Sequence, residues 1–270
     1  MKIAFLGGGN MASALVGGLL GKGFTAASIS IIEKIEASRA RLERDYGVHA
    51  SMHADSATES AEMLVIAVKP QDLRAAVAPL ASLVPGRLVL SIAAGVRLAD
   101  ISRWLGGHER LVRSMPNTPA LIGAGISALY APPTVGAEDR ASAEAVLSAV
   151  GQTVWVEEER LLDPVTAVSG SGPAYVFWFI EQLAAGGVAL GLTEDTARRL
   201  ALQTVLGSAQ LAAGSPEPVS VLRERVTSRG GTTEAALSVF VQEQMAERLK
   251  KALQAASRRG AELGDQLGRD

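Results

Sequence analysis

The chain has 270 residues, enough for one large domain or two ordinary ones, and hydrophobic residues make up 48% of it. Its formal net charge is −2 and the charges are evenly spread, so neither a nucleic-acid-binding face nor an acidic tail is indicated. The absence of cysteine excludes disulfides and thiol chemistry and fits a reducing cytoplasm. The first apolar run, Ile3 to Leu6, is too short for a signal peptide, and no stretch approaches the roughly 20 apolar residues that span a bilayer. We therefore expect a cytoplasmic protein with no membrane or nucleic-acid partner.

Short β-branched runs alternate with helical spacing over the first 160 residues. This alternation predicts βαβ units and a largely parallel, doubly wound sheet in a Rossmann-like α/β domain. Pro70 cannot continue a hydrogen-bond ladder, so Val68 and Pro70 should bracket the end of one strand. The expected strands are Lys2–Leu6, Ser28–Ile32, Met63–Val68, Leu88–Ile92, Leu111–Ser114, Ile126–Tyr130 and Thr153–Val156.

The strand pattern stops near Leu161, and four or five helices are expected beyond it. Their predicted starts and limits come from capping residues and chain breaks. We expect a cap at Ser171–Pro173, a cap at Thr193 followed by the acids Glu194 and Asp195, a short helix over Val219–Val226, and a final stretch from Thr232 or Thr233 to about Leu263 with one break. The prediction is a dinucleotide-binding domain over residues 1–160 and an all-α domain over residues 161–270.

Two of the expected helices, Ala174–Leu190 and Thr196–Leu211, are apolar on more than one face. A helix that is hydrophobic all round has to be buried on several sides. A helical domain of about 110 residues cannot bury two such helices alone. We therefore predict a homodimer that forms through the helical half.

A glycine-rich turn follows the first expected strand. Gly7, Gly9 and Ala12 fit the G-x-G-x-x-G/A pattern, and Asn10 and Met11 lie between them at the start of a helix. The glycines permit a tight turn, and the helix N-terminus offers free N–H groups to a pyrophosphate. The turn predicts a bound dinucleotide, with a purely structural glycine turn as the alternative.

Glu33 lies at the end of the second expected strand, at an offset of 33 − 9 = 24 residues from Gly9. An acid near this offset binds the ribose 2′-hydroxyl, which favours NADH. Lys34, Arg39 and Arg41 follow closely and could meet the 2′-phosphate of NADPH. A solvated strand end is the alternative interpretation, and the cofactor stays open between NADPH and NADH.

Three further segments follow expected strands: Ala67–Gln71, Ser91–Gly95 and Met115–Pro119. A doubly wound sheet binds its ligand beyond the carboxyl ends of its strands. We therefore expect these segments to line the cofactor, although ordinary loop chemistry explains each of them equally well. The residues of these segments expected to bind the cofactor are Ala67, Val68, Lys69, Pro70, Ala93 and Asn117.

Two polar turns belong to the helical half. Ser169–Tyr175 contains two serines and two glycines, which suit either an anion-binding turn or an ordinary cap. Val226–Glu234 places two glycines and two threonines at a helix start, where N–H groups and hydroxyls can hold a carboxylate. No G-x-S-x-G motif suggests a hydrolase, and His49 and His53 lack a third ligand, so no metal site is predicted.

These motifs, in this order and at these intervals, resemble those of the pyrroline-5-carboxylate reductases over essentially the whole chain. The resemblance implies an NAD(P)H-dependent oxidoreductase that acts on a cyclic C=N bond, reducing 1-pyrroline-5-carboxylate to L-proline in the last step of proline synthesis. It also implies a Rossmann domain followed by a helical dimerisation domain, an active site between them at a dimer interface, and in many members a decamer of five dimers.

By the same resemblance, the substrate carboxylate binds Ser228, Gly231 and Thr232. The Thr233 hydroxyl lies near the ring nitrogen as the catalytic group, and Ser171 lines the pocket. Two positions depart from the family pattern. Arg229 stands where proline or asparagine is common, and Glu33 stands where many NADPH-using members have a small polar residue.

Two other functions fit parts of the sequence. A β-hydroxyacid dehydrogenase of the 6-phosphogluconate type would place a catalytic lysine at a helix start in the second domain, and residues 161–249 contain none. A non-catalytic dinucleotide sensor would leave the turn at residues 230–233 without a purpose. The sequence therefore favours the reductase.

Overall fold

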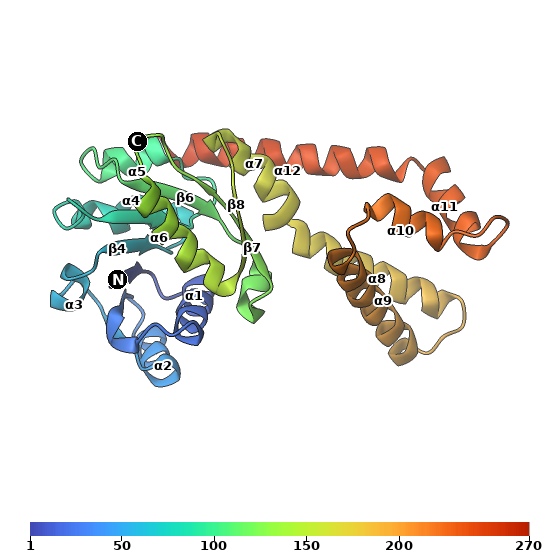
Figure 1. Cartoon of the computed structure of the whole chain (residues 1–270), viewed down its shortest axis with the longest axis horizontal. Coiled ribbons are helices and arrows are strands. Elements are labelled where there is room, and N and C mark those ends of the chain that lie inside the picture. Colours follow the sequence, from blue (N-terminus) through green and yellow to red (C-terminus); the bar gives the residue numbers. More distant parts are fainter. Residues whose placement is uncertain (270) are drawn as a thin grey trace. The chain divides into compact units, whose positions relative to one another are not determined.

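The structure is a computed structural model in which residues 1–269 are described. Its chain divides into two compact units (Figure 1). The first contains Met1–Ser171 together with the residues from Ala255 onward, and the second contains Gly172–Gln254. The division at residues 160/161 rested on the change from mixed to helical patterning and stays a prediction. No helix within residues 1–269 is long and apolar enough to cross a membrane.

The first unit is built on an eight-stranded sheet of order β3-β2-β1-β4-β5-β6-β7-β8. All neighbouring strands are parallel except β6 and β7. From β1 the chain adds β2 and β3 on one side and then β4 on the other side. The boundary between β1 and β4 is therefore the topological switch point of the sheet. The strands are β1 (Ile3–Leu6), β2 (Ile29–Ile32), β3 (His49–Ser51), β4 (Met63–Ile66), β5 (Leu88–Ser91), β6 (Leu111–Met115), β7 (Gly125–Tyr130) and β8 (Gly151–Trp155).

The seven predicted strands are confirmed, and β3 adds an edge strand. Strand β4 ends at Ile66, two residues before the predicted limit at Val68. Lys69 instead becomes the N-cap of a short 3-10 helix, η2 (Pro70–Asp72), with Pro70 at its first position. Proline suits that position because its missing N–H would have no partner there.

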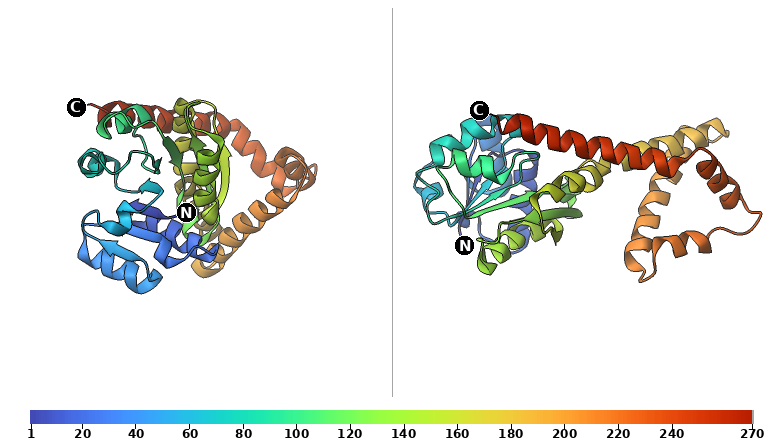
Figure 2. Two further views of the ribbon diagram at one scale, coloured as in Figure 1. Left: turned by 60° about the vertical axis from the view of Figure 1, so that its left-hand side comes forward. Right: turned by 90° about the horizontal axis from the view of Figure 1, so that it is seen from above.

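Helices cover both faces of the sheet (Figure 2). Ile3 and Phe5 of β1 pack with α1, α2 and α6, whereas Ala4 and Leu6 pack on the opposite face with α4 and α5. A strand buried on both faces reads as an uninterrupted apolar run, which is why these strands were visible in the sequence. The helices of this unit up to residue 165 are α1 (Asn10–Gly21), α2 (Glu36–Tyr46), α3 (Ser56–Glu59), α4 (Leu73–Val77), α5 (Leu98–Trp104), α6 (Ala137–Leu147) and α7 (Leu162–Val165).

The end of the last helix, α12 (Met245–Leu267), packs on this first unit. A Cβ on Gly264 would lie 2.8 Å from the Gly95 carbonyl oxygen, so helix and loop touch backbone to backbone. Arg97 pairs with Asp265 at 2.6 Å, and the Arg103 guanidinium donates to the Gly268 carbonyl at 2.7 Å. Close packing and charged contacts thus hold the last turns in place.

A partly buried charge cluster lies beside these contacts. Buried Arg113 pairs with Glu159 at 3.0 Å, and the same Glu159 oxygen accepts the backbone N–H of Leu98 at 2.8 Å. Burial raises the pKa of the nearby Asp163 carboxyl, although the charges of Arg113 and Arg97 act in the opposite direction. The cluster ties helix α5 and strand β6 to the segment that leads into α7.

The second unit consists of helices. They are α8 (Gly172–Ala189), α9 (Glu194–Gly214), α10 (Val219–Arg225), α11 (Thr232–Gln242) and the part of α12 up to Gln254. Helices α8 and α9 approach closely, because a Cβ on Gly187 would lie 3.1 Å from the Ala197 Cβ. The predicted break in the final stretch is confirmed at Gln244, whose φ is +54°.

Two predicted helix starts need correction. Thr193 does cap α9, accepting the Thr196 N–H at 3.4 Å, with Glu194 and Asp195 in the first turn. The Ser171 cap is wrong, because the backbone is already helical there and continues into α8. The Thr232 or Thr233 cap is also wrong: Gly231 is the N-cap of α11, so the threonines are its first two helical residues.

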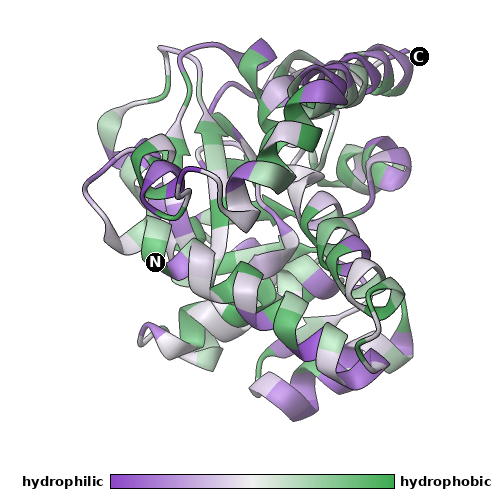
Figure 3. Ribbon diagram, turned by 90° about the vertical axis from the view of Figure 1, so that its right-hand side faces the viewer, coloured by the Kyte–Doolittle hydropathy of each residue, from purple (hydrophilic) through white to green (hydrophobic). Residues whose placement is uncertain are grey.

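Large apolar side chains remain exposed along the helices of the second unit. Figure 3 colours the ribbon by hydropathy, with hydrophobic residues in green. Only Ala197 and Ala201 are buried in this unit among the described residues. Exposed apolar surface on this scale marks an interaction surface. Among the most exposed are Leu190, Val241, Leu211, Phe177, Leu200 and Trp178.

Candidate active site

The glycine turn begins where β1 ends. The Gly7 N–H donates to the Ile32 carbonyl at 2.8 Å, and the Gly7 φ is +100°, a conformation that side-chain-bearing residues rarely adopt. A Cβ on Gly7 would lie 2.9 Å from the Ala67 carbonyl oxygen and 3.0 Å from a Val68 methyl carbon. The glycine turn and the predicted segment Ala67–Gln71 therefore touch, and only glycine fits at this point of contact.

Side chains form hydrogen bonds with both the N–H and the carbonyl of Gly8. Its N–H donates to Glu33 Oε2 at 2.8 Å, and its carbonyl accepts from the Arg41 guanidinium at 3.2 Å. Arg41 also donates to the Ser13 hydroxyl at 3.1 Å, which links the turn to helix α1. The turn is thus preformed by residues of β2, α1 and α2.

Gly9 is the N-cap of α1, and the space in front of it is open. Nothing lies within 4 Å of a Cβ placed on Gly9. No described side chain caps α1, and its first turn contains no acid. The first N–H groups of a helix lack partners inside the helix and attract anions. The turn therefore fits a pyrophosphate group, with Gly9, Asn10 and Met11 at the open end.

Three other predicted cofactor segments lie in the same unit. Lys69 and Pro70 open the η2 turn directly after Val68. Ala93 is buried after β5, with its N–H 3.3 Å from the Ser91 hydroxyl. The Asn117 amide is used within the fold, because it donates to the Ser169 carbonyl at 3.2 Å and accepts the Ile126 N–H at 2.9 Å. Asn117 thus joins two motifs that the sequence could not connect.

Ser171 lies at the end of a π-helical turn, Thr166–Gly170. Its N–H donates to the Thr166 carbonyl at 2.8 Å, five residues back. A Cβ on Gly170 would lie only 2.6 Å from the Met115 terminal methyl carbon, so this turn packs tightly on the end of β6. Single π-turns inside helices are frequent at functional sites. No periodicity in the sequence indicated this turn.

The predicted carboxylate turn lies in the second unit, between α10 and α11. Gly230 has a φ of +71°, and its N–H donates to Glu234 Oε2 at 2.6 Å. The Gly231 N–H donates to the Ser228 carbonyl at 3.0 Å. Glu234 reaches back from the first turn of α11 to hold the loop, a role that no motif in the sequence indicated.

The chemical character of this turn is that of an anion site. No described side chain caps α11. Within residues 1–269, no hydrogen bond engages the hydroxyl of Ser228, Thr232 or Thr233. Ser228 and Thr232 are exposed, whereas Thr233 is half-buried. Free N–H groups and several unused hydroxyls on one short loop suit a carboxylate.

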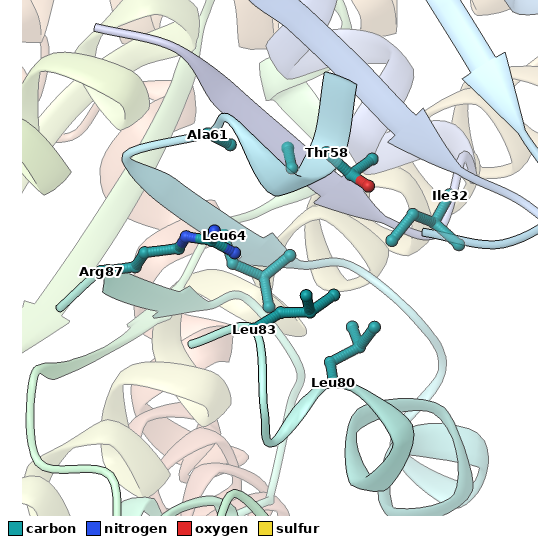
Figure 4. A pocket seen from close by; sticks show the side chains of 8 residues that line it. Ile32, Thr58, Ala61, Leu64, Leu80, Leu83 and Arg87 are labelled. Atoms are coloured by element: carbon teal, nitrogen blue, oxygen red, sulfur yellow. The ribbon is translucent and has the colours of Figure 1, made fainter. Parts of the chain in front are cut away.

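Two other places in the described part of the chain show no catalytic or metal-binding cluster. A small pocket of the first unit is apolar, and its Thr58 hydroxyl already bonds to Asp55 (Figure 4). His49 bonds to Asp55 at 2.6 Å. No group of three or more potential metal-binding side chains occurs in the described part of the chain.

Comparison with protein families covers both halves of the chain. Residues 159–263 match the model described as pyrroline-5-carboxylate reductase dimerisation. Residues 2–95 match the model described as NADP oxidoreductase, coenzyme F420-dependent. The first match includes the exposed apolar helices, and the second includes the glycine turn.

Full-length relatives and solved structures agree with these matches. The pyrroline-5-carboxylate reductase of Pseudomonas aeruginosa is 44% identical over 99% of this chain and 98% of its own length. The enzyme of the same name from Synechocystis is 42% identical over 98% of both chains. A solved pyrroline-5-carboxylate reductase from Coxiella burnetii superimposes with a TM-score of 0.92 at 39% identity, covering 97% of this chain and 98% of that one. A pyrroline carboxylate reductase from Plasmodium falciparum with NADP bound gives 0.84 at 26% identity, covering 98% of both. The chain therefore belongs to the pyrroline-5-carboxylate reductase family, NAD(P)H-dependent enzymes of proline biosynthesis that associate through their helical half.

Proposed function

We propose that the chain reduces 1-pyrroline-5-carboxylate to L-proline, with NAD(P)H held by the glycine turn of the first unit and the substrate carboxylate held by the turn of the second. One observation carries these assignments. Each turn leads into a helix whose first N–H groups meet no capping side chain among the described residues. Such N-termini bind anions, and the reaction brings together an anionic cofactor and an anionic substrate.

The cofactor assignment extends from the turn to its neighbours. Gly7, Gly9, Asn10 and Met11 would hold the pyrophosphate, and the segment Ala67–Pro70 would form the adjoining wall because it contacts Gly7 directly. Ala93 and Asn117 would extend this wall. When bound, NAD(P)H supplies the hydride.

The substrate assignment rests on the second turn. Ser228, Gly231 and Thr232 would bind the carboxylate, Thr233 would hold the ring nitrogen, and Ser171 would contact the same substrate. A cyclic imine is readily protonated, and the resulting iminium accepts a hydride without a protein nucleophile. The residues of the chain therefore orient the substrate, exclude water and supply fixed dipoles.

The test follows NADH and NADPH oxidation with 1-pyrroline-5-carboxylate. Wild type is expected to turn over, and no turnover with either cofactor would refute the function. Thr233→Ala should lower kcat about 10- to 100-fold, because a hydrogen bond to a charged group contributes about 1.5–3 kcal/mol. Ser238→Ala, on the same helix, removes a hydroxyl that bonds to the Glu234 carbonyl and should leave kcat unchanged. Complete loss of activity in a folded Thr233→Ala variant would contradict an orienting role.

We also propose a decamer of five dimers and a cytoplasmic location. The exposed apolar residues of the second unit support association between copies, with Leu190 at 89% and Val241 at 78% exposed. The lack of cysteine supports the compartment. Light scattering coupled to size exclusion measures the mass in solution, and a monomer at micromolar concentration would contradict the assembly.

A further inference from the structure

We infer that Glu33 makes this chain prefer NADH to NADPH. The inference rests on the proposed function only in taking the glycine turn as the dinucleotide site. It concerns this chain's own side chains beyond the carboxyl end of β2, which lie within the match to the NADP oxidoreductase model. The argument depends on where the Glu33 carboxylate is held and on what the neighbouring arginines do.

The Glu33 carboxylate is fixed against the glycine turn. One oxygen accepts the Gly8 N–H and the other accepts the Ile35 N–H, both at 2.8 Å. A Cβ on Gly8 would lie 3.3 Å from Oε2, so the carboxylate faces the turn at close range. These two bonds hold the acid beyond the end of β2, beside the turn that fits the pyrophosphate.

A doubly wound dinucleotide site places the adenosine ribose beyond the end of the second strand. Each carboxylate oxygen keeps a lone pair after its bond to a backbone N–H. It can therefore still accept a hydrogen bond from a ribose 2′-hydroxyl. A 2′-phosphate offers only negatively charged acceptors at pH 7, so it would face a fixed like charge.

The nearby arginines are oriented toward the backbone. Arg39 donates to the Glu33 carbonyl at 2.8 Å and to the Lys34 carbonyl at 2.9 Å. Arg41 donates to the Gly8 carbonyl and to the Ser13 hydroxyl. Binding a phosphate would require either guanidinium to give up bonds that hold this loop. Lys34 is exposed, but the exposed acid Glu36 lies two residues away.

The Plasmodium falciparum relative, at 26% identity, has NADP bound. A pyrophosphate is common to both cofactors, whereas the 2′-group meets the side chains that follow β2. In this chain those side chains begin with Glu33, Lys34 and Ile35.

The experiment measures Kd for NADH and for NADPH without substrate, from the change in nucleotide fluorescence, and then kcat/KM for both with 1-pyrroline-5-carboxylate. Wild type is expected to bind NADH at least fivefold more tightly. Glu33→Gln keeps one oxygen to accept the Gly8 N–H, gives up the bond from the Ile35 N–H and removes the charge. The Kd for NADPH should therefore fall about tenfold while the Kd for NADH changes less than threefold. The matched control Glu36→Gln removes a charge three residues away and should leave the ratio within twofold.

A second measurement needs no variant. Salt screens repulsion between a carboxylate and a phosphate, so the ratio of the NADPH Kd to the NADH Kd should fall as ionic strength rises from about 0.02 M to about 0.3 M. A wild-type preference for NADPH would overturn the inference, as would a ratio that rises with salt or an unchanged ratio in folded Glu33→Gln. Binding without turnover would instead refute the reductase while leaving Glu33 tested.

Discussion

Gly7 and Gly9 stand two residues apart in one turn, and alanine at each should have opposite effects. Gly7→Ala places a Cβ at a φ of +100° and 2.9 Å from the Ala67 carbonyl oxygen. The left-handed backbone costs about 1–2 kcal/mol, and overpacking costs about 1–3 kcal/mol. We therefore expect a loss of about 3 kcal/mol in the free energy of unfolding of the first unit.

Gly9→Ala should spare stability and harm binding. Its φ of −70° suits alanine and its Cβ would meet nothing within 4 Å, but alanine is a poorer N-cap than glycine, so stability should change by no more than about 1 kcal/mol. The same Cβ would project into the open space before α1, where the pyrophosphate is proposed to bind. The Kd for NADH should rise at least tenfold, or about 1.4 kcal/mol.

Urea unfolding followed by circular dichroism measures the first effect, and nucleotide fluorescence titration measures the second. The two variants are matched controls for one another. If Gly9→Ala lost as much stability as Gly7→Ala, the space before α1 would not be open. If it bound NADH like wild type, the cofactor assignment would fail.

Three other substitutions test separate contacts. Glu234→Ala removes the 2.6 Å hydrogen bond from the Gly230 N–H that holds the predicted carboxylate turn. Steady-state kinetics should show a KM for the imine that is about tenfold higher and a kcat within threefold of wild type. Burial lowers the pKa of His108 from its ordinary 6.5, so the stability it contributes is present above pH 6.5 and is lost as pH falls through the folded-state pKa. His108→Gln should therefore show a smaller drop in Tm than wild type between about pH 7.5 and about pH 5.5. Gly264→Ala should lower the free energy of unfolding by about 1–3 kcal/mol in urea, because its Cβ would press on a backbone carbonyl at 2.8 Å.

Each of these has a control. Glu234→Gln keeps the acceptor and should restore KM, and a raised KM in both variants would show that charge rather than the hydrogen bond matters. An equal fall in Tm with and without His108 would assign the acid sensitivity to other groups. Gly260→Ala lies on the same helix with its nearest contact at 3.6 Å, and it should be tolerated because alanine favours a helix more than glycine does. Equal losses at both glycines would therefore contradict the packing argument for Gly264.

Features that depend on neighbouring residues were predictable from the sequence. The turn from Gly7 to Ala12, the Thr193 cap and the break at Gln244 are local, and the strands appear as apolar runs because helices cover both faces of the sheet. The roles proposed for the site residues remain predictions that the experiments above address.

Features that depend on distant contacts were not predictable. The antiparallel direction of β7 comes from pairing that no periodicity records. The π-turn before Ser171 depends on packing against Met115, and the Thr232 cap was replaced because glycine supplied the extended N-cap conformation. The capping preference for threonine is an average, and here the turn leaves those hydroxyls unbonded.

The return of the chain at Ala255 has a practical consequence. The polypeptide passes from the first unit into the second after Ser171 and returns to the first after Gln254. The second unit is therefore an insertion that is joined to the first by two chain connections. A single protease cut inside it would leave both fragments anchored to the nucleotide-binding body. A fluorescent label attached at exposed Gln266, in the last turns of α12, would likewise report on the nucleotide-binding body, although it follows the helices of the second unit in the sequence.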